Sequence, residues 1–124
     1  MANPNIVNVS AIYGTTTYAA LSTTSATTLL SNAASSGLVY KVDDIVVSNV
    51  NGSTAATITV SVNSAAAGGG TAYRLAYQIS VPAGASLIVT DKSTAFYLME
   101  NQSVVVTAGT ANYLEVVLSY ENIS

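Results

Sequence analysis

Alternation of apolar and polar residues is the feature of this sequence that most restricts its fold. In the stretch 72–81, every second residue is apolar: Tyr73, Leu75, Tyr77, Ile79 and Val81. Successive side chains of a strand point to opposite faces, so this period of two predicts a strand with one buried face. An amphipathic helix would instead repeat its apolar residues every three or four positions. The pattern therefore favours strands over helices.

The same period of two recurs along most of the chain, and no segment combines a sustained helical period with capping residues. We therefore expect an all-β fold of about eight to ten short strands: an antiparallel β-sandwich of jelly-roll-like or Greek-key type. The residues predicted to share an inward face in each segment are Val7, Val9, Ala11 and Tyr13; Leu38, Tyr40, Val42, Val46 and Val50; Ile58, Val60 and Val62; Leu87 and Val89; Phe96 and Leu98; Val104 and Val106; and Leu114, Val116, Leu118 and Tyr120.

Glycine and proline mark the breaks between these segments. Asn51-Gly52 favours a hairpin turn from the preceding strand into the strand near Thr57. Pro82-Ala83-Gly84 predicts a second turn. Ser64–Thr71, which contains three consecutive glycines, predicts a flexible loop in solvent. The length of 124 residues indicates one domain, with residues 1–14 as an N-terminal arm or first strand and 15–124 as the sandwich.

Charge is scarce in this chain. Only 7% of the residues are charged, against about 25% in an ordinary soluble domain. With no Cys and no His, thiol chemistry, imidazole chemistry and Cys/His zinc sites are excluded. Three basic residues (Lys41, Arg74 and Lys92) are too few for phosphate-driven nucleic-acid binding. No apolar run is long enough for a membrane span, so we expect neither a nucleic-acid nor a membrane partner.

The acidic residues offer little for catalysis. Asp43 and Asp44 are adjacent, and neighbours in a strand point to opposite faces, so they do not readily share a proton or a metal ion. Asp91 and Glu100 lie near predicted turns, where solvated acids are common, although a calcium site that includes Asp91 stays a minor alternative. We expect no catalytic residues, no metal and no cofactor. A small hydrolase that uses Asp43, Asp91, Glu100 or Glu115 is the weakest hypothesis.

The eight tyrosines and the charge-poor outward faces suggest protein contacts instead. Tyr73, Tyr77 and Tyr120 have inward parity, which predicts core positions. Outward faces rich in Ser, Thr, Ala and Asn can meet another protein without desolvating charges, so we expect a homo-oligomer. The N-terminal segment could add a strand to a neighbour. The candidate contact residues are Val7, Val9, Ile12, Tyr13, Tyr18, Tyr97 and Tyr113.

Several segments resemble small virion proteins of tailed phages that infect marine cyanobacteria: 1–14, 31–37, 45–52, 79–85 and 114–124. The stretch Leu98–Ser103 departs from the Leu-x-x-Gly-Asp-Ser turn common in such proteins, because the Gly-Asp pair is replaced. The resemblance implies a virion structural protein and not an enzyme.

Within that family we favour a capsid decoration or cement protein on the outer head surface. Its partners would be the major capsid protein or other virion subunits, with a trimer as the expected oligomer, and it would be made in the host cytoplasm. The alternative is a tail- or fibre-associated adhesion module that binds a receptor.

Overall fold

Nine strands and two short 3-10 helices make up the structure, a computed structural model that describes residues 3–124. Met1 and Ala2 lie outside the described residues. The all-β prediction and its strand number are confirmed. The elements are β1 (Ile12–Ala20), β2 (Thr27–Asn32), β3 (Val39–Asn49), β4 (Ala56–Asn63), η1 (Ala66–Gly68), β5 (Ala72–Val81), β6 (Ser86–Thr90), η2 (Lys92–Thr94), β7 (Phe96–Leu98), β8 (Gln102–Ala108) and β9 (Leu114–Ile123).

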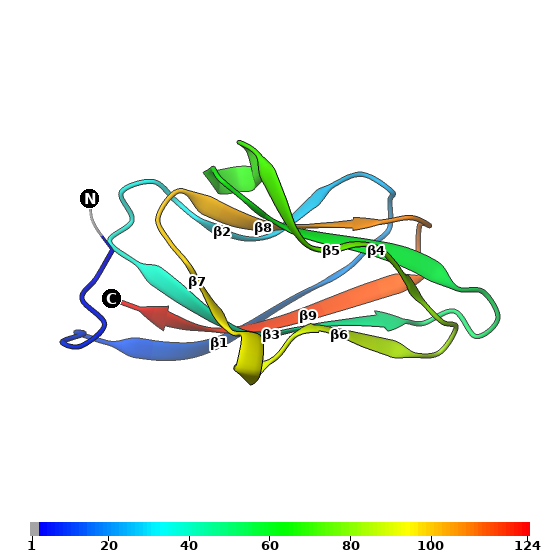
Figure 1. Cartoon of the computed structure of the whole chain (residues 1–124), viewed down its shortest axis with the longest axis horizontal. Coiled ribbons are helices and arrows are strands. Elements are labelled where there is room, and N and C mark those ends of the chain that lie inside the picture. Colours follow the sequence, from blue (N-terminus) through cyan, green and yellow to red (C-terminus); the bar gives the residue numbers. More distant parts are fainter. Residues whose placement is uncertain (1–2) are drawn as a thin grey trace.

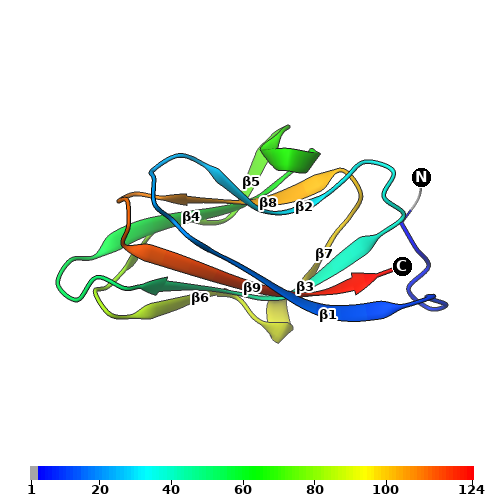
Figure 2. The ribbon, with the colours of Figure 1, turned by 180° about the vertical axis from the view of Figure 1, so that it is seen from behind.

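The strands form two antiparallel sheets that stack as a sandwich (Figure 1). Sheet A has the order β1-β9-β3-β6, and β7 also pairs with β3. Sheet B has the order β2-β8-β4-β5. Seen from behind, β1 is the edge strand of sheet A beside β9, and both termini lie at the same end of the sandwich (Figure 2).

The pairing scheme is that of a jelly roll. β4 pairs with β5, β3 with β6 and β7, β2 with β8, and β1 with β9, as if one long hairpin had been rolled up. Connections between successive strands therefore mostly cross from one sheet to the other. The turn at Asn51-Gly52 is one of these crossings, from β3 in sheet A to β4 in sheet B, so the predicted hairpin at this position is wrong.

The core lies between the inner faces of the two sheets. In sheet B, Ile58 and Val60 are fully buried and Val62 packs against them. In sheet A, Leu114, Val116 and Leu118 are buried and Tyr120 packs against the core, as the alternation predicts. Burial of such aliphatic side chains supplies most of the stabilisation in a chain with so few charges.

Bulges shift the inward face in two strands, where the simple alternation fails. In β3 the register shifts between Val42 and Asp44. One extra residue exchanges the two faces of a strand, so Val42 is buried, whereas Val46 points to the outer face of sheet A. Leu38–Val50 therefore does not present a single inward face, and Val50 is exposed.

In β5 the register shifts twice, and Gln78 adopts a left-handed φ of 48°. The inward positions become those of Ala76 and Val81. Tyr73 and Tyr77 are exposed instead of buried, which corrects the prediction that they belong to the core.

The glycine-rich connection between β4 and β5 folds back over the outer face of sheet B. The main-chain N–H of Gly68 donates to Ser103 Oγ at 3.0 Å, and Ser103 Oγ donates to the carbonyl of Ala65 at 2.8 Å. Asn63 Nδ2 donates to the carbonyl of Gly68 at 3.0 Å. This segment is therefore bonded to β4 and β8, in contrast to the free loop that its composition predicts.

Candidate interaction surface

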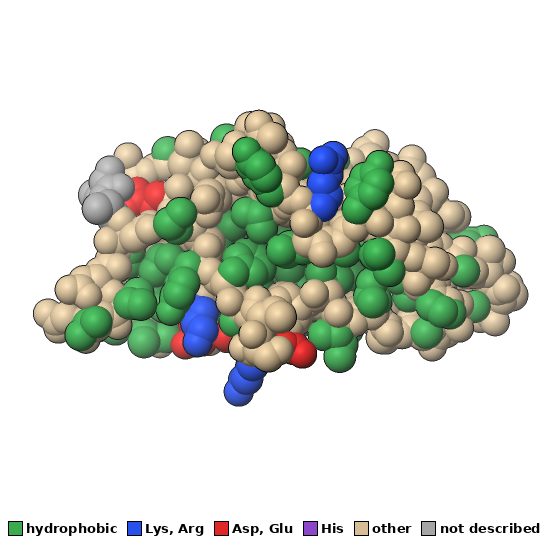
Figure 3. Space-filling view, viewed as in Figure 1, with side chains coloured by type: hydrophobic (Ala, Val, Ile, Leu, Met, Phe, Trp, Pro, Cys, Tyr) green, Lys and Arg blue, Asp and Glu red, His purple; other side chains and the backbone are tan. Residues whose placement is uncertain are grey.

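Most of the exposed large apolar side chains lie in three parts of the molecule: the outer face of sheet A, edge strand β5, and the N-terminal segment (residues 3–11). Figure 3 shows hydrophobic side chains along the seam between the two sheets, with few charged groups around them. Exposed apolar side chains that cluster on a charge-poor surface are typical of contact sites.

A row of four apolar side chains crosses the outer face of sheet A. The register places Tyr18 of β1 opposite Val117 of β9, Val117 opposite Val46 of β3, and Val46 opposite Ile88 of β6. Val116, the neighbour of Val117 in its strand, is fully buried, so Val117 points outward. Tyr18 is 76% exposed, Ile88 61% and Val117 43%. We call these four residues the apolar row.

Paired hydroxyl side chains flank the apolar row. On one side, Ser48 Oγ and Ser86 Oγ lie 2.9 Å apart, and on the other, Thr16 Oγ1 and Ser119 Oγ lie 3.2 Å apart. Each pair is a hydrogen bond between adjacent strands of sheet A. The hydroxyl groups beside the apolar row therefore have partners within the sheet.

Edge strand β5 carries the second exposed group. Tyr73, Leu75, Tyr77 and Ile79 are all more than two-fifths exposed, and the Arg74 guanidinium lies 5.5 Å from the ring centroid of Tyr77. A cation over an aromatic face is a modest stabilising contact at an exposed site. The two bulges of β5 interrupt its regular edge, which disfavours pairing with a strand of another molecule.

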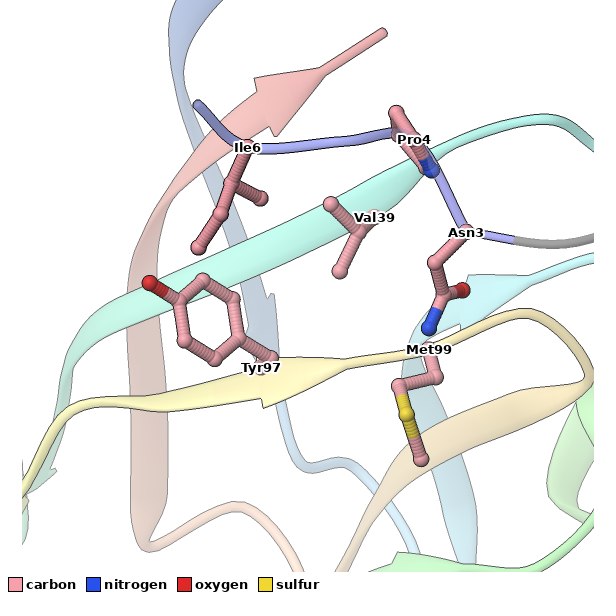
Figure 4. A pocket seen from close by; sticks show the side chains of 6 residues that line it. All are labelled: Asn3, Pro4, Ile6, Val39, Tyr97 and Met99. Atoms are coloured by element: carbon pink, nitrogen blue, oxygen red, sulfur yellow. The ribbon is translucent and has the colours of Figure 1, made fainter. Parts of the chain in front are cut away.

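The N-terminal segment lies over the end of sheet A and lines one side of an open cavity of about 250 Å³. In Figure 4 the side chains of Ile6 and Asn3 point from this segment toward β7, beside Val39 of β3. Tyr97 and Met99 complete the lining. The main-chain N–H of Glu100 donates to Asn3 Oδ1 at 3.2 Å, which holds the segment in place. The cavity is mainly apolar and suits an apolar side chain better than a sugar.

The structure places the seven predicted contact residues in different surroundings. Val7, Ile12, Tyr13, Tyr18 and Tyr97 are exposed, Val9 is half-buried, and Tyr113 packs against the core. Tyr18 belongs to the apolar row and Tyr97 to the cavity, so these seven residues do not form one surface. Their role in contacts stays a prediction.

The acidic side chains of the described residues come from strands β3 and β9 and from the connections around Asp91 and Glu100. Residues 3–124 contain no cluster of three acidic side chains that could hold a metal ion. Hydrogen bonds from the Ser93 side chain and main chain hold the pKa of Asp91 below its ordinary value, because Asp91 caps η2. Lys41 Nζ lies 3.9 Å from Glu121 Oε2 on the outer face of sheet A. No described helix could span a membrane.

Sequence reasoning missed three members of the apolar row: Val46, Ile88 and Val117. A signal was present, because each is the middle residue of an apolar triplet: Ile45-Val46-Val47, Leu87-Ile88-Val89 and Val116-Val117-Leu118. In an antiparallel strand with one buried face, such a triplet must place an apolar residue on the outer face. The triplets predict exposure but do not show that the three residues are neighbours.

Comparison with known proteins gives structural neighbours only, since no protein-family model and no curated protein matches the sequence. One similar solved chain comes from the disulfide-linked pili of Bacillus endospore appendages, with 13% identity, a TM-score of 0.53, and coverage of 91% of this chain and 88% of that chain. Another comes from the acid-stable capsid of Helicobacter pylori bacteriophage KHP30, with 14% identity, a TM-score of 0.53, and coverage of 94% and 90%. At these identities, the likeness shows that this chain shares its fold with subunits of two assembled particles.

Proposed function

We propose that this chain is a non-enzymatic structural subunit of a phage particle, and specifically a decoration or cement protein on the outer surface of the capsid. The observation that carries the proposal is the set of exposed apolar side chains on a nearly uncharged jelly roll. Such a surface can be buried against other subunits at a low desolvation cost. The fold shared with a chain of a phage capsid structure supports the same conclusion.

The pilus is the competing assembly, and the sequence offers an argument against it. The similar pili are described as disulfide-linked, whereas this sequence contains no cysteine. Disulfide linkage has no counterpart in this sequence, so we infer that the chain assembles by noncovalent burial. Cementing a preformed shell meets that requirement, because many weak contacts act together on one surface.

The adhesion module on a tail or fibre is the second candidate from the sequence, but no feature of residues 3–124 favours it. Sugar-binding sites combine an aromatic platform with several convergent polar groups. The cavity under the N-terminal segment has Tyr97 and Asn3, and its other lining residues are Pro4, Ile6, Val39 and Met99. This lining favours contact with an apolar protein surface.

Copy number and position in the particle test the proposal. Quantitative mass spectrometry and cryo-electron microscopy of purified particles of a phage that encodes this chain should find it on the head in a fixed, high ratio to the major capsid protein. A few copies at the tail would instead support the adhesion module. Complete absence from purified particles would refute both assignments.

A further inference from the structure

We propose that the free edge of β1 pairs, in antiparallel orientation, with β1 of a second copy of this chain, so that the two copies of sheet A join into one sheet. The two-fold axis passes between Thr16 and the partner's Thr16. The inference deepens the proposed function, on which its biological meaning rests, by naming the element through which copies associate. The pairing itself is a property of the isolated protein and is tested separately.

The edge of β1 is longer and more regular than the other sheet edges (Figure 2). The register of β5 shifts twice, that of β2 shifts once within six residues, and β6 has only five residues. Bulges and short length are features that protect a sheet edge from pairing with another chain. β1 has nine residues without charge or proline, and its register with β9 runs without a shift. Such an edge can serve as a template for a further strand.

Five residues of β1 direct their main-chain groups away from β9. Just before the strand begins, Ala11 and Ser124 exchange both main-chain hydrogen bonds, and just after it ends, Leu21 N–H donates to the carbonyl of Leu114. Hydrogen-bonded and non-hydrogen-bonded pairs alternate in an antiparallel ladder, so the odd-numbered residues bond to β9. The residues that face the free edge are Ile12, Gly14, Thr16, Tyr18 and Ala20. No strand of residues 3–124 pairs with this edge, so these five residues offer their N–H and C=O groups to another chain.

The faces of β1 are open as well as its edge. Tyr13 and Tyr18 lie on opposite faces of the strand, and their side chains are 65% and 76% exposed. In the neighbouring strand β9, by contrast, Val116 and Leu118 are fully buried under sheet B. A strand added beside β1 would therefore gain aromatic contacts on both faces in addition to main-chain hydrogen bonds.

The order of large and small side chains makes β1 complementary to itself. With Thr16 opposite the partner's Thr16, all five outward-facing residues of each copy form hydrogen-bonded pairs. Tyr18 then lies beside the partner's Gly14 on one face, and Tyr13 lies beside the partner's Ala19 on the other. Each large ring therefore meets a small residue. A register shifted by two residues would lose this match and leave an outward-facing residue at one end of β1 unpaired.

Charge does not oppose this pairing. The acidic residues of sheet A that lie nearest to the free edge are Glu115 and Glu121 in β9, opposite Ala20 and Gly14 of β1. In the joined sheet, β9 and the partner's β9 are three strand spacings apart, which is about 14 Å. This distance exceeds the screening length of about 8 Å at physiological ionic strength. The two copies can therefore pair without bringing carboxylates together.

Variants at Thr16 test the pairing and its register, because this residue faces its own copy across the two-fold axis. In sedimentation equilibrium from micromolar to millimolar concentration, the full wild-type chain should show a monomer–dimer equilibrium. Thr16→Lys and Thr16→Asp should each raise the dissociation constant at least about tenfold, since each sets like charges opposite one another. An equimolar mixture of the two should dimerise again, because opposite charges then face each other. Thr71→Lys, at an exposed position before β5, is the matched control and should leave the dissociation constant unchanged.

A wild-type monomer at all concentrations, a trimer, or a mixture that associates no better than the single variants would overturn the proposal. Thr16→Cys gives a second measurement, because the chain has no other cysteine. The Cα atoms of a hydrogen-bonded antiparallel pair lie about 5.5 Å apart, within the range that a disulfide spans. Mild oxidation should therefore link Thr16→Cys into dimers and leave Thr71→Cys monomeric, whereas equal linkage of the two variants would contradict the pairing.

Particle binding distinguishes this proposal from the proposed function. If the chain dimerises through β1 but is missing from purified particles, the capsid role fails and the pairing stands. If the wild-type chain is monomeric but Thr16→Lys abolishes binding to capsids, another virion protein pairs with β1. The self-pairing is then refuted, while the capsid role stands.

Discussion

Asn49 and Val81 connect the two sheets: Nδ2 of Asn49 in β3 donates to the main-chain carbonyl of Val81 at the end of β5, at 3.0 Å. The same Nδ2 donates to the carbonyl of Thr54 at 2.9 Å, and Oδ1 accepts from the main-chain N–H of Asn51 at 2.9 Å. Asn49 is only 3% exposed. One buried amide thus holds the β3–β4 connection against the end of β5.

Asn49→Ala should lower the free energy of unfolding by about 2 to 4 kcal/mol. The substitution leaves main-chain groups in the β3–β4 connection and at the end of β5 without partners. Urea unfolding measures the loss. Asn8→Ala, at an exposed position, is the control and should change stability by less than about 0.5 kcal/mol. Similar losses for both variants would show that the amide contacts of Asn49 contribute little.

Gly68→Ala should detach the glycine-rich connection from sheet B. Gly68 has a φ of 77°, and an added Cβ would lie 2.7 Å from Thr28 Oγ1. Gly84 has a similar φ of 69°, but an added Cβ there meets open space. Both alanine variants incur left-handed strain, so the contact with Thr28 should make Gly68→Ala the more destabilising by about 1 to 2 kcal/mol. Thermal unfolding of the two variants gives this difference directly, and equal midpoints would contradict it.

Tyr40 should make the protein less stable at high pH. Burial raises the pKa of the Tyr40 hydroxyl, and the nearby Tyr120, whose ring centroid is 4.9 Å away, raises it further. Below the ordinary pKa of 10.0, the folded and unfolded chains both keep this proton. Above it, the unfolded chain releases the proton first, so stability falls until the pH passes the raised pKa of the folded chain.

Tyr40→Phe removes this proton and should make the alkaline fall in stability shallower. Urea unfolding at a series of pH values from neutral to strongly alkaline measures the slope in both proteins. The difference between variant and wild type should be constant at neutral pH and change only in the alkaline range. Parallel curves over the whole series would refute this contribution of Tyr40.

Removal of residues 1–8 should weaken the fold without abolishing it. Beneath the N-terminal segment, Val39 is 3% exposed, and its burial is lost when the segment is removed. β1 begins only at Ile12, and the main-chain N–H of Ser10 donates to the carbonyl of Ser124 at 2.7 Å. Both lie after the removed residues, so the pairing of β1 with β9 is retained. We expect a loss of about 1 to 3 kcal/mol and an unchanged far-ultraviolet circular dichroism spectrum.

Point variants show whether the truncation destabilises the fold through the loss of buried apolar side chains or through the loss of chain length. Ile6→Ser removes a side chain that lines the cavity, whereas Val7→Ser changes its 91% exposed neighbour. Only Ile6→Ser should lower the unfolding midpoint. Binding of the truncated chain to capsids then tests the predicted arm: unchanged binding would contradict a role of the N-terminal segment in contacts.

Strand content could be predicted from local pattern because the period of two is a local property. In β9 the alternation of Leu114, Val116 and Leu118 runs without interruption, and the predicted face is the buried one. In β3 and β5 the same reasoning fails after each bulge, because one inserted residue reverses every later side chain. A bulge depends on pairing with the neighbouring strand, which local alternation does not encode.

Turn residues are also a local signal, and they do not determine which sheet the next strand joins. Asn51-Gly52 correctly marks a reversal of the chain, but it does not indicate whether the next strand joins the same sheet or the opposite one. That choice depends on how the rolled hairpin buries its apolar faces as a whole.

The sequence by itself determined the all-β class, most of the core, and the scarcity of catalytic and charged groups. Only the tertiary structure decided the candidate interface, because the apolar row joins residues 18, 46, 88 and 117, which are far apart in the chain. Each of these residues lies on the outer face of sheet A for a local reason: the edge position of Tyr18, the bulge before Val46, and the apolar triplets around Ile88 and Val117. Their alignment follows from strand order and register, which are set by packing between segments that the chain brings together only when it folds.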